Sequence, residues 1–134
     1  MAYYDYEVDK IPDDHIKFIN DLLPYYIDEQ RKIIFVHGGF NMGKGFEKSE
    51  EDDFIWDRDI IQRFAQYDLP VKIYKNYMFI VGHTPVKLLT FYGSNGNEYK
   101  PFMRKDRIID LDTSAGYGGP LTIMDCDTFE YWQA

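Results

Sequence analysis

Apolar residues recur at helical spacing in two segments of the chain. In residues 12–23, Pro12 and the two aspartates after it have the features of a helix start, and Pro24 ends the apolar pattern. A second helix is expected over residues 51–65, where apolar residues again recur at helical spacing. Its side chains expected to face the core are Phe54, Ile55, Ile61 and Phe64.

Short apolar runs predict strands. Residues 33–36 lie between charged residues and Gly38-Gly39, which is typical of a strand buried on both faces. Residues 71–81 predict another strand, which ends at Gly82-His83. An edge strand is expected within residues 1–10 and a loop over 38–50. Residues 88–92 and 98–103 predict a hairpin around the turn Ser94–Asn97. Two further strands are expected over 108–111 and 121–124, joined by the glycine-rich segment 116–119.

These elements predict an α+β domain with a mixed β-sheet and two main helices. A chain of 134 residues corresponds to one domain and can bury a single core without much margin. Aromatic residues make up 18% of the chain, which is enough to fill that core and leave several rings for a surface. A cluster of such exposed rings would indicate an interface.

The net charge of −8 argues against direct binding of nucleic acid, because no basic patch offsets it. The longest acidic stretch is Glu47–Asp53, which is either a solvated surface or a face that competes with nucleic acid for a basic protein. The single cysteine, Cys126, allows no intrachain disulfide and fits a reducing compartment. With neither a signal-peptide pattern nor an apolar run of ~20 residues, we expect a cytoplasmic protein without a membrane segment.

Two of the three histidines follow predicted strands and lie next to glycines. His37 precedes Gly38-Gly39, and His83 lies between Gly82 and Thr84-Pro85. Ligand sites tend to form at the carboxyl ends of buried strands, and neighbouring glycines allow close approach of other groups. Two neutral imidazoles suit a borderline divalent cation such as zinc or manganese, although a histidine after a strand can also be a hydrogen-bonded turn residue.

Four motifs, in order, resemble the calcineurin-like metallophosphatases of the phosphoprotein phosphatase superfamily, in their bacterial and phage form. Residues 35–39 (Phe-Val-His-Gly-Gly) are similar to the histidine-glycine-glycine strand end, and residues 53–58 to a Trp-x-Arg segment. Residues 81–85 resemble the Gly-His-Thr-Pro motif, and residues 108–122 the closing strands. The resemblance covers the chain from about residue 12 onward and implies a single truncated domain, half of a metallophosphoesterase-like sandwich.

The resemblance assigns roles to three residues. In the family a dinuclear metal centre hydrolyses phosphate esters, and His37 and His83 match the two histidines that bind the second metal. Arg58 matches the arginine that holds the substrate phosphate, a role suited to a planar guanidinium. From the residue pattern alone, Arg58 could equally be an exposed helix arginine in a local ion pair.

The chain also departs from the family pattern. The Asp-x-His, Gly-Asp-x-x-Asp-Arg and Gly-Asn-His-Glu/Asp motifs, which supply the first metal's ligands, the bridging aspartate and the catalytic acid, do not occur in it. His15 matches no motif and is expected in a surface or helix-capping role, and Ser114 stands where the family usually has glycine. A mononuclear site would need a further ligand, for which residue type alone suggests Asp112, Asp125 or Cys126.

Three hypotheses follow for the function. The first is a non-catalytic protein that binds one divalent metal, zinc ahead of manganese, and acts through a protein partner. Such a partner could be a nucleic-acid-binding protein with a basic surface, as for an anti-CRISPR inhibitor of a Cas nuclease. The second is a metal-dependent phosphoesterase that needs a second chain or a homodimer to complete its site. The third is an inert domain in which the histidines serve packing only.

Overall fold

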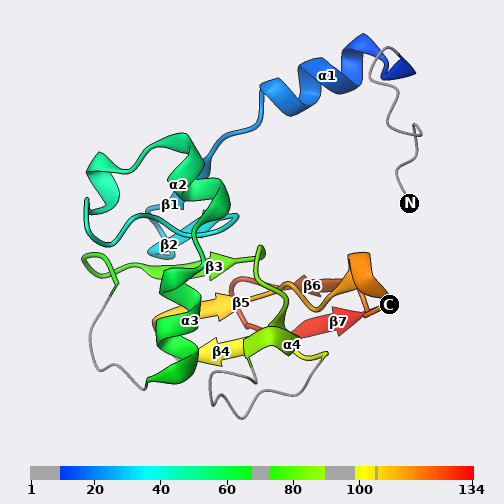
Figure 1. The fold of residues 1–134 in the computed structure, drawn as a ribbon. Helices are drawn as coiled ribbons and strands as arrows, with labels where there is room; N and C mark the ends of the chain where they lie inside the picture. The colour runs from blue at the N-terminus through cyan, green and yellow to red at the C-terminus, as the bar shows by residue number, and fades with distance from the viewer. Residues whose placement is uncertain (1–9, 68–72, 90–98, 105) are drawn as a thin grey trace.

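The computed structural model describes residues 10–67, 73–89, 99–104 and 106–134. Figure 1 shows the arrangement of the helices and strands. In chain order they are α1 (Asp13–Asn20), β1 (Tyr25–Asp28), β2 (Ile33–Val36), η2 (Phe46–Lys48), α2 (Glu51–Trp56), α3 (Asp59–Gln66), β3 (Met78–Val81), α4 (Val86–Leu89), β4 (Phe102–Arg104), β5 (Ile108–Asp110), η4 (Ala115–Tyr117), β6 (Thr122–Met124) and β7 (Tyr131–Gln133).

A mixed five-stranded sheet forms the centre of the fold, with the strand order β1-β2-β3-β5-β4. The three inner strands are parallel, with Ile34 opposite Phe79 and Ile80 opposite Ile109, while β1 and β4 run antiparallel at the two edges. A second, two-stranded sheet pairs β6 with β7. The expected α+β class and mixed sheet are therefore confirmed, whereas the likeness to half of a phosphoesterase sandwich stays a prediction.

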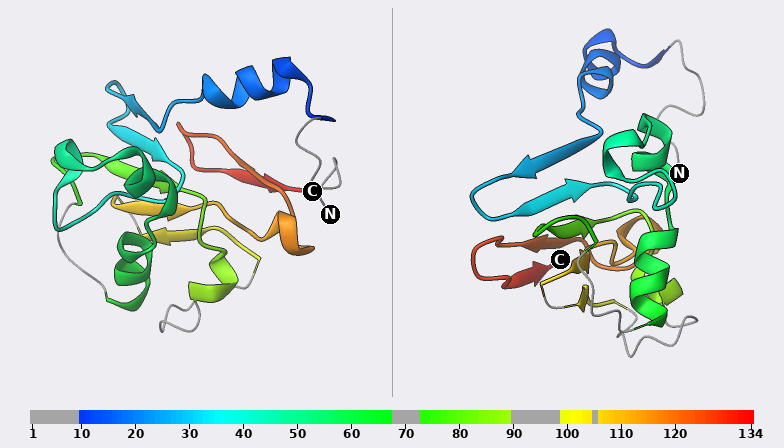
Figure 2. Two further views of the ribbon diagram at one scale, coloured as in Figure 1. Left: turned by 45° about the horizontal axis from the view of Figure 1, so that its top comes forward. Right: turned by 90° about the vertical axis from the view of Figure 1, so that its left-hand side faces the viewer.

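The two faces of the large sheet are covered differently. On one face, side chains such as Ile34 and Phe79 pack against Ile61 and Phe64 of α3 in the main hydrophobic core. On the other face a smaller cluster centred on Ile80 packs against β6 and the residues that follow it. The right-hand view of Figure 2 shows the sheet nearly edge-on, with α2 and α3 on one side and the β6–β7 pair on the other.

Helix α1 projects away from the sheet (Figures 1 and 2). It confirms the helix predicted after Pro12, and none of its residues is buried. The apolar residues of this segment stay 38–71% exposed: Ile16, Phe18, Ile19, Leu22 and Leu23. Neither α1 nor any other helix in the described part of the chain is long and apolar enough to cross a membrane.

The prediction of a single helix over residues 51–65 is wrong, because this segment forms two helices, α2 and α3. Asp57 adopts an extended conformation with φ −60° and ψ 136°, which stops α2. Its carboxylate accepts the backbone N–H of Ile60 at 3.3 Å and so helps to start α3. The inward orientation was predicted correctly for Phe54, Ile61 and Phe64, which are buried.

Other boundaries also differ from the predictions. Of the strand predicted over 71–81, residues 71 and 72 lie outside the described ranges, and within residues 73–81 only β3 is regular, because the chain turns between Tyr74 and Tyr77. The predicted hairpin placed Leu88 and Leu89 in its first strand, but both residues belong to α4. β4, which lies in the predicted second strand, pairs with β5. Pro85 explains the helix, since proline favours a first helical turn, and its carbonyl accepts the Leu88 N–H at 2.8 Å.

Two strands were not predicted from the sequence, and two predicted elements fall on residues outside the described ranges. The sequence pattern gave no indication of β1 or β7, which are short and only partly buried. The strands over 108–111 and 121–124 are confirmed as β5 and β6, although they belong to different sheets. The edge strand expected near the N-terminus and the Ser94–Asn97 turn lie in residues outside the described ranges.

The backbone conformation of Ser114, directly before η4, can be tested by substitution. Its φ of 71° and ψ of 29° are left-handed, and its buried hydroxyl has no hydrogen-bond partner among the described residues. We expect Ser114→Gly to raise the free energy of unfolding by about 1 kcal/mol, because glycine adopts this conformation without steric strain. Urea denaturation measures the change. Ser114→Ala is the control, since it removes the hydroxyl but keeps the strain; an equal gain in both variants would contradict a contribution from backbone strain.

Candidate metal centre

The parallel pairing of β2 and β3 brings the two glycine-flanked histidines together. His37 directly follows β2, and His83 follows β3 by two residues at the same edge of the sheet. The backbone N–H of Gly82 donates to the His37 carbonyl at 2.9 Å and extends the pairing past the strands. As a result, Nε2 of His37 and Nδ1 of His83 lie 3.0 Å apart.

That separation suits two chemical states. In the metal-free protein, one imidazole N–H can donate to the other ring, because either nitrogen can carry the proton. Two nitrogens bound to one zinc ion at about 2.05 Å with tetrahedral geometry would lie about 3.3 Å apart, close to the observed distance. The pair therefore fits two neighbouring corners of a coordination shell.

Three side chains surround the histidine pair. The Trp56 ring meets the His83 ring edge to face, with centroids 5.5 Å apart. Nη1 of Arg58 donates to the His83 carbonyl and to the Thr84 hydroxyl, both at 3.3 Å. The structure thus places all three predicted site residues, His37, His83 and Arg58, in one region.

The surroundings keep His83 neutral. Partial burial lowers its pKa below 6.5, and the positive charge of Arg58 and the His37 ring lower it further, while the Asp112 carboxylate opposes the shift. The neutral imidazole is the form that binds metals. His83 Nε2 is buried and has no hydrogen-bond partner in the described part of the chain.

Gly38 and Gly39 allow the end of α2 to reach the histidines. Both backbone N–H groups donate to the Phe54 carbonyl, at 2.8 and 3.3 Å. A methyl group at Gly38 would lie 2.7 Å from the carbonyl oxygen of Ile55, and one at Gly39 would lie 2.6 Å from the Asp57 carboxylate. This close packing brings Trp56 and Arg58 up to His83.

The remaining candidate ligands do not complete a metal site. Over the described ranges, no group of three or more His, Cys, Asp or Glu side chains is placed to hold an ion. Asp112 is near enough to influence His83 electrostatically, but its carboxylate accepts the Ser114 N–H at 3.0 Å. The histidine pair therefore fits half of a four-ligand shell, and the dinuclear centre implied by the resemblance lacks a second ligand set here.

The other candidates lie elsewhere. Asp125 accepts backbone N–H groups of Asp127 and Thr128 in the turn after β6. Cys126 packs against the smaller hydrophobic cluster, and burial raises the pKa of its thiol. His15 lies on the exposed helix α1, as expected.

Asp110 is a supporting residue that sequence reasoning missed. It is completely buried at the end of β5, and its carboxylate accepts the Asp112 N–H at 2.9 Å. Burial raises its pKa well above 3.8, which favours the protonated form of the carboxyl group. The sequence signal for Asp110 was its position within an apolar run, because acidic residues are rarely buried without a specific role.

Comparison with protein families, with curated proteins and with solved structures finds no match to this chain. The metallophosphatase resemblance therefore stays a prediction based on the four sequence motifs.

The packing against Gly38 can be tested by substitution. We expect Gly38→Ala to lower the free energy of unfolding by about 2 kcal/mol, because the added methyl group meets backbone atoms that cannot rotate away. Gly82→Ala is the matched control: a methyl group there meets no atom within 4 Å. Thermal and urea unfolding measure both, and equal losses would contradict the predicted close packing.

The lowered pKa of His83 predicts a pH dependence of stability. Below about pH 6.5 the unfolded chain takes up a proton at His83 that the folded protein resists, so the contribution of His83 to stability should fall as pH decreases toward its lower folded-state pKa. Urea midpoints between pH 7.5 and 5.5, measured with a chelator, test this. His83→Gln should lose less stability on acidification than wild type does. The same slope in both proteins would contradict the shift.

Proposed function

We propose that this protein binds one divalent metal ion through His37 and His83 and acts by binding another protein, without catalysing a reaction on its own. The observation that carries the proposal is the 3.0 Å separation of the two ring nitrogens, which fits two ligands of one cation. The lowered pKa of His83 supports it, because a metal ion binds the neutral form of imidazole.

Zinc fits this site better than manganese. Imidazole nitrogens are common zinc ligands, whereas manganese favours sites rich in carboxylate oxygens. Water or a side chain from the bound protein would complete the shell, because the described residues offer no third ligand. A bound metal would then add stability to the folded protein and to its complex.

The charge of the chain supports a basic partner. The net charge is −8, and the acidic residues of α2 begin close to the site, with Glu51 and Asp52 exposed. Such a face attracts proteins with a positive surface, such as nucleic-acid-binding proteins. Direct binding of nucleic acid is not part of the proposal.

Metal binding can be tested by isothermal titration calorimetry with zinc and by visible absorption with cobalt. We expect about one equivalent per chain and a higher melting temperature in the presence of zinc. His37→Ala and His83→Ala should each weaken binding by on the order of 100-fold, because each removes one of two protein ligands. His15→Ala is the matched control and should bind as wild type does. Binding that survives in the His37→Ala/His83→Ala double variant would contradict the site.

A second candidate function is phosphoester hydrolysis in a complex with another chain. Arg58 lines a hollow of about 540 Å³ together with Gln62, Thr84 and Lys87, directly beside His83. Cationic and hydroxyl groups in one hollow suit a phosphate group. The three motifs absent from this chain would have to come from the other chain, because two-metal hydrolysis needs both ligand sets.

Assays with p-nitrophenyl phosphate separate the two functions. The chain with zinc or manganese, assayed both alone and together with the proteins that co-purify with it, should show no turnover above buffer under the first proposal. Metal-dependent turnover that is lost in Arg58→Ala and His37→Ala would overturn that proposal and establish the second function.

A further inference from the structure

The outer face of the β6–β7 pair carries three exposed apolar side chains. Side chains alternate between the two faces of a strand, so Leu121, directly before β6, shares one face with Ile123. The strand register places Ile123 opposite Trp132 of β7. These three residues are 59%, 64% and 59% exposed, whereas Met124, on the other face, packs against the large sheet. They therefore form one apolar patch on the side of the pair that faces away from the large sheet.

Two carboxylates border this patch where the chain turns from β6 to β7. The Asp125 N–H donates to the Glu130 carbonyl at 2.9 Å, so the pairing continues from Ile123 and Trp132 to these two residues. A hydrogen bond from the Thr128 N–H is the main cause that lowers the pKa of Asp125 and keeps it ionised. The Glu130 side chain is exposed and has no hydrogen-bond or ion-pair partner in the described part of the chain.

No cation of the same segment balances these charges. Residues 108–134 contain five acidic residues and no lysine, arginine or histidine. Arg31 reaches the turn from the end of β1, but its guanidinium pairs with Asp127. The patch and its two carboxylates therefore form a surface that is apolar in the middle and negative at one end. We call it the β6–β7 face; it consists of Leu121, Ile123, Trp132, Asp125 and Glu130.

We propose that the β6–β7 face binds a short segment of another protein in which an apolar residue lies next to an arginine or lysine. The cation lies over the Trp132 ring, because tryptophan is the strongest cation–π partner, and forms an ion pair with Glu130. The apolar side chain covers Leu121 and Ile123 and removes their surface from water. An exposed tryptophan in an apolar patch is also typical of the residues that contribute most to binding at protein interfaces.

The inference rests on the proposed function, because it takes the partner to be a basic protein, and it adds the place of contact. The β6–β7 pair and α2 lie on opposite sides of the large sheet, as the right-hand view of Figure 2 shows. The β6–β7 face contains neither His37 nor His83. Zinc affinity and affinity for a basic segment can therefore be measured separately, and a failure of this inference leaves the metal site untouched.

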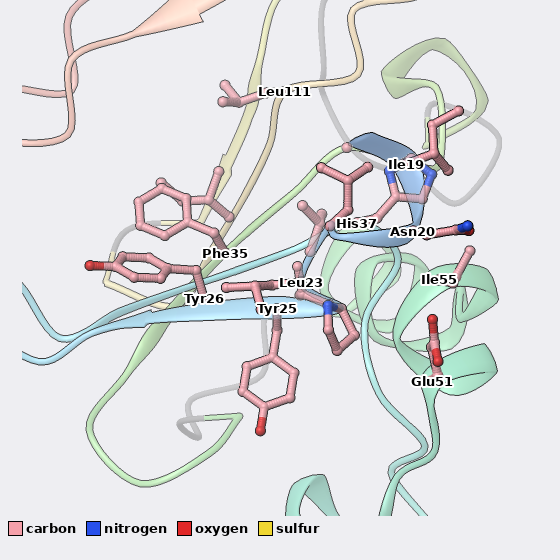
Figure 3. A pocket seen from close by; sticks show the side chains of 16 residues that line it. Ile19, Asn20, Leu23, Tyr25, Tyr26, Phe35, His37, Glu51, Ile55 and Leu111 are labelled. Carbon is pink, nitrogen blue, oxygen red and sulfur yellow. The ribbon is translucent and has the colours of Figure 1, made fainter. Parts of the chain in front are cut away.

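Another apolar surface of the chain provides a control. The groove of about 790 Å³ in Figure 3 is lined by Ile19, Tyr26 and Phe35, among others, and by no residue of β6 or β7. Tyr26 is 58% exposed, close to the exposed fraction of Trp132. A substitution at Tyr26 therefore distinguishes binding at the β6–β7 face from general adsorption to exposed aromatic side chains.

NMR titration of the nitrogen-15-labelled protein with a hexapeptide of alternating leucine and arginine tests the inference. The chain has two tryptophans, Trp56 and Trp132, whose indole N–H signals report separately on α2 and on the β6–β7 face. We expect the Trp132 signal to shift and saturate while the Trp56 signal stays unchanged. Peptides with glutamate in place of arginine, or with serine in place of leucine, should bind roughly 10-fold more weakly, because each lacks one half of the complementary surface.

Two variants test the residues. Trp132→Ala should weaken binding of the leucine–arginine peptide roughly 10-fold, and Glu130→Gln roughly 3-fold, whereas the matched control Tyr26→Ala should bind as wild type does. All three side chains are exposed, so the fold should be preserved, as circular dichroism can verify. Affinity should also fall between 50 and 500 mM salt, because salt screens the ion pair.

Three results would overturn the inference. One is a Trp132 signal that stays unchanged at millimolar concentrations of the leucine–arginine peptide. Another is a shift of the Trp56 signal with binding lost in Glu51→Gln and kept in Glu130→Gln, because the contact would then lie on α2. The last is an equal loss in Trp132→Ala and Tyr26→Ala. Binding that is lost in Trp132→Ala and kept in Tyr26→Ala supports it.

Discussion

The parallel pairing of β2 with β3 is the constraint on which the candidate site depends. Parallel strands end at the same edge of a sheet, and the hydrogen bond from Gly82 to the His37 carbonyl continues the pairing into the loops. The backbone pairing of the two strands therefore brings His37 and His83 together, independently of the contacts that their side chains make. β5 lies parallel to β3 and brings Asp112 toward the same edge.

The break between α2 and α3 gives this edge its chemical surroundings. Arg58 directly follows the extended Asp57 and lies beside His83 and Thr84, to which its guanidinium donates hydrogen bonds. The absence of side chains at Gly38 and Gly39 makes the approach close enough. Strand pairing places the two imidazoles, and the helix break places the Arg58 guanidinium and the Trp56 indole beside them.

The sequence predicts the closeness of the two histidines better than it predicts the element boundaries. His37 and His83 were found because each follows an apolar run and lies beside glycine. The helix break at Asp57 was missed because the apolar periodicity continues across it; in the structure Asp57 is extended and its carboxylate lies against Gly39. β1 was missed because a four-residue strand at a sheet edge has too short a pattern to stand out. The exposure of α1 could not be foreseen either, since an apolar arc normally indicates a buried face.

The central claim is that both imidazoles bind one cation instead of only hydrogen-bonding to each other. Nitrogen-15 NMR of the histidine rings during a zinc titration tests it most directly, because it reports each ring nitrogen separately. The account predicts that Nε2 of His37 and Nδ1 of His83 shift together and saturate at about one equivalent of zinc, while the His15 signals stay unchanged. Unchanged signals from His37 and His83 at saturating zinc would contradict it and leave the pair as a hydrogen-bonded structural contact.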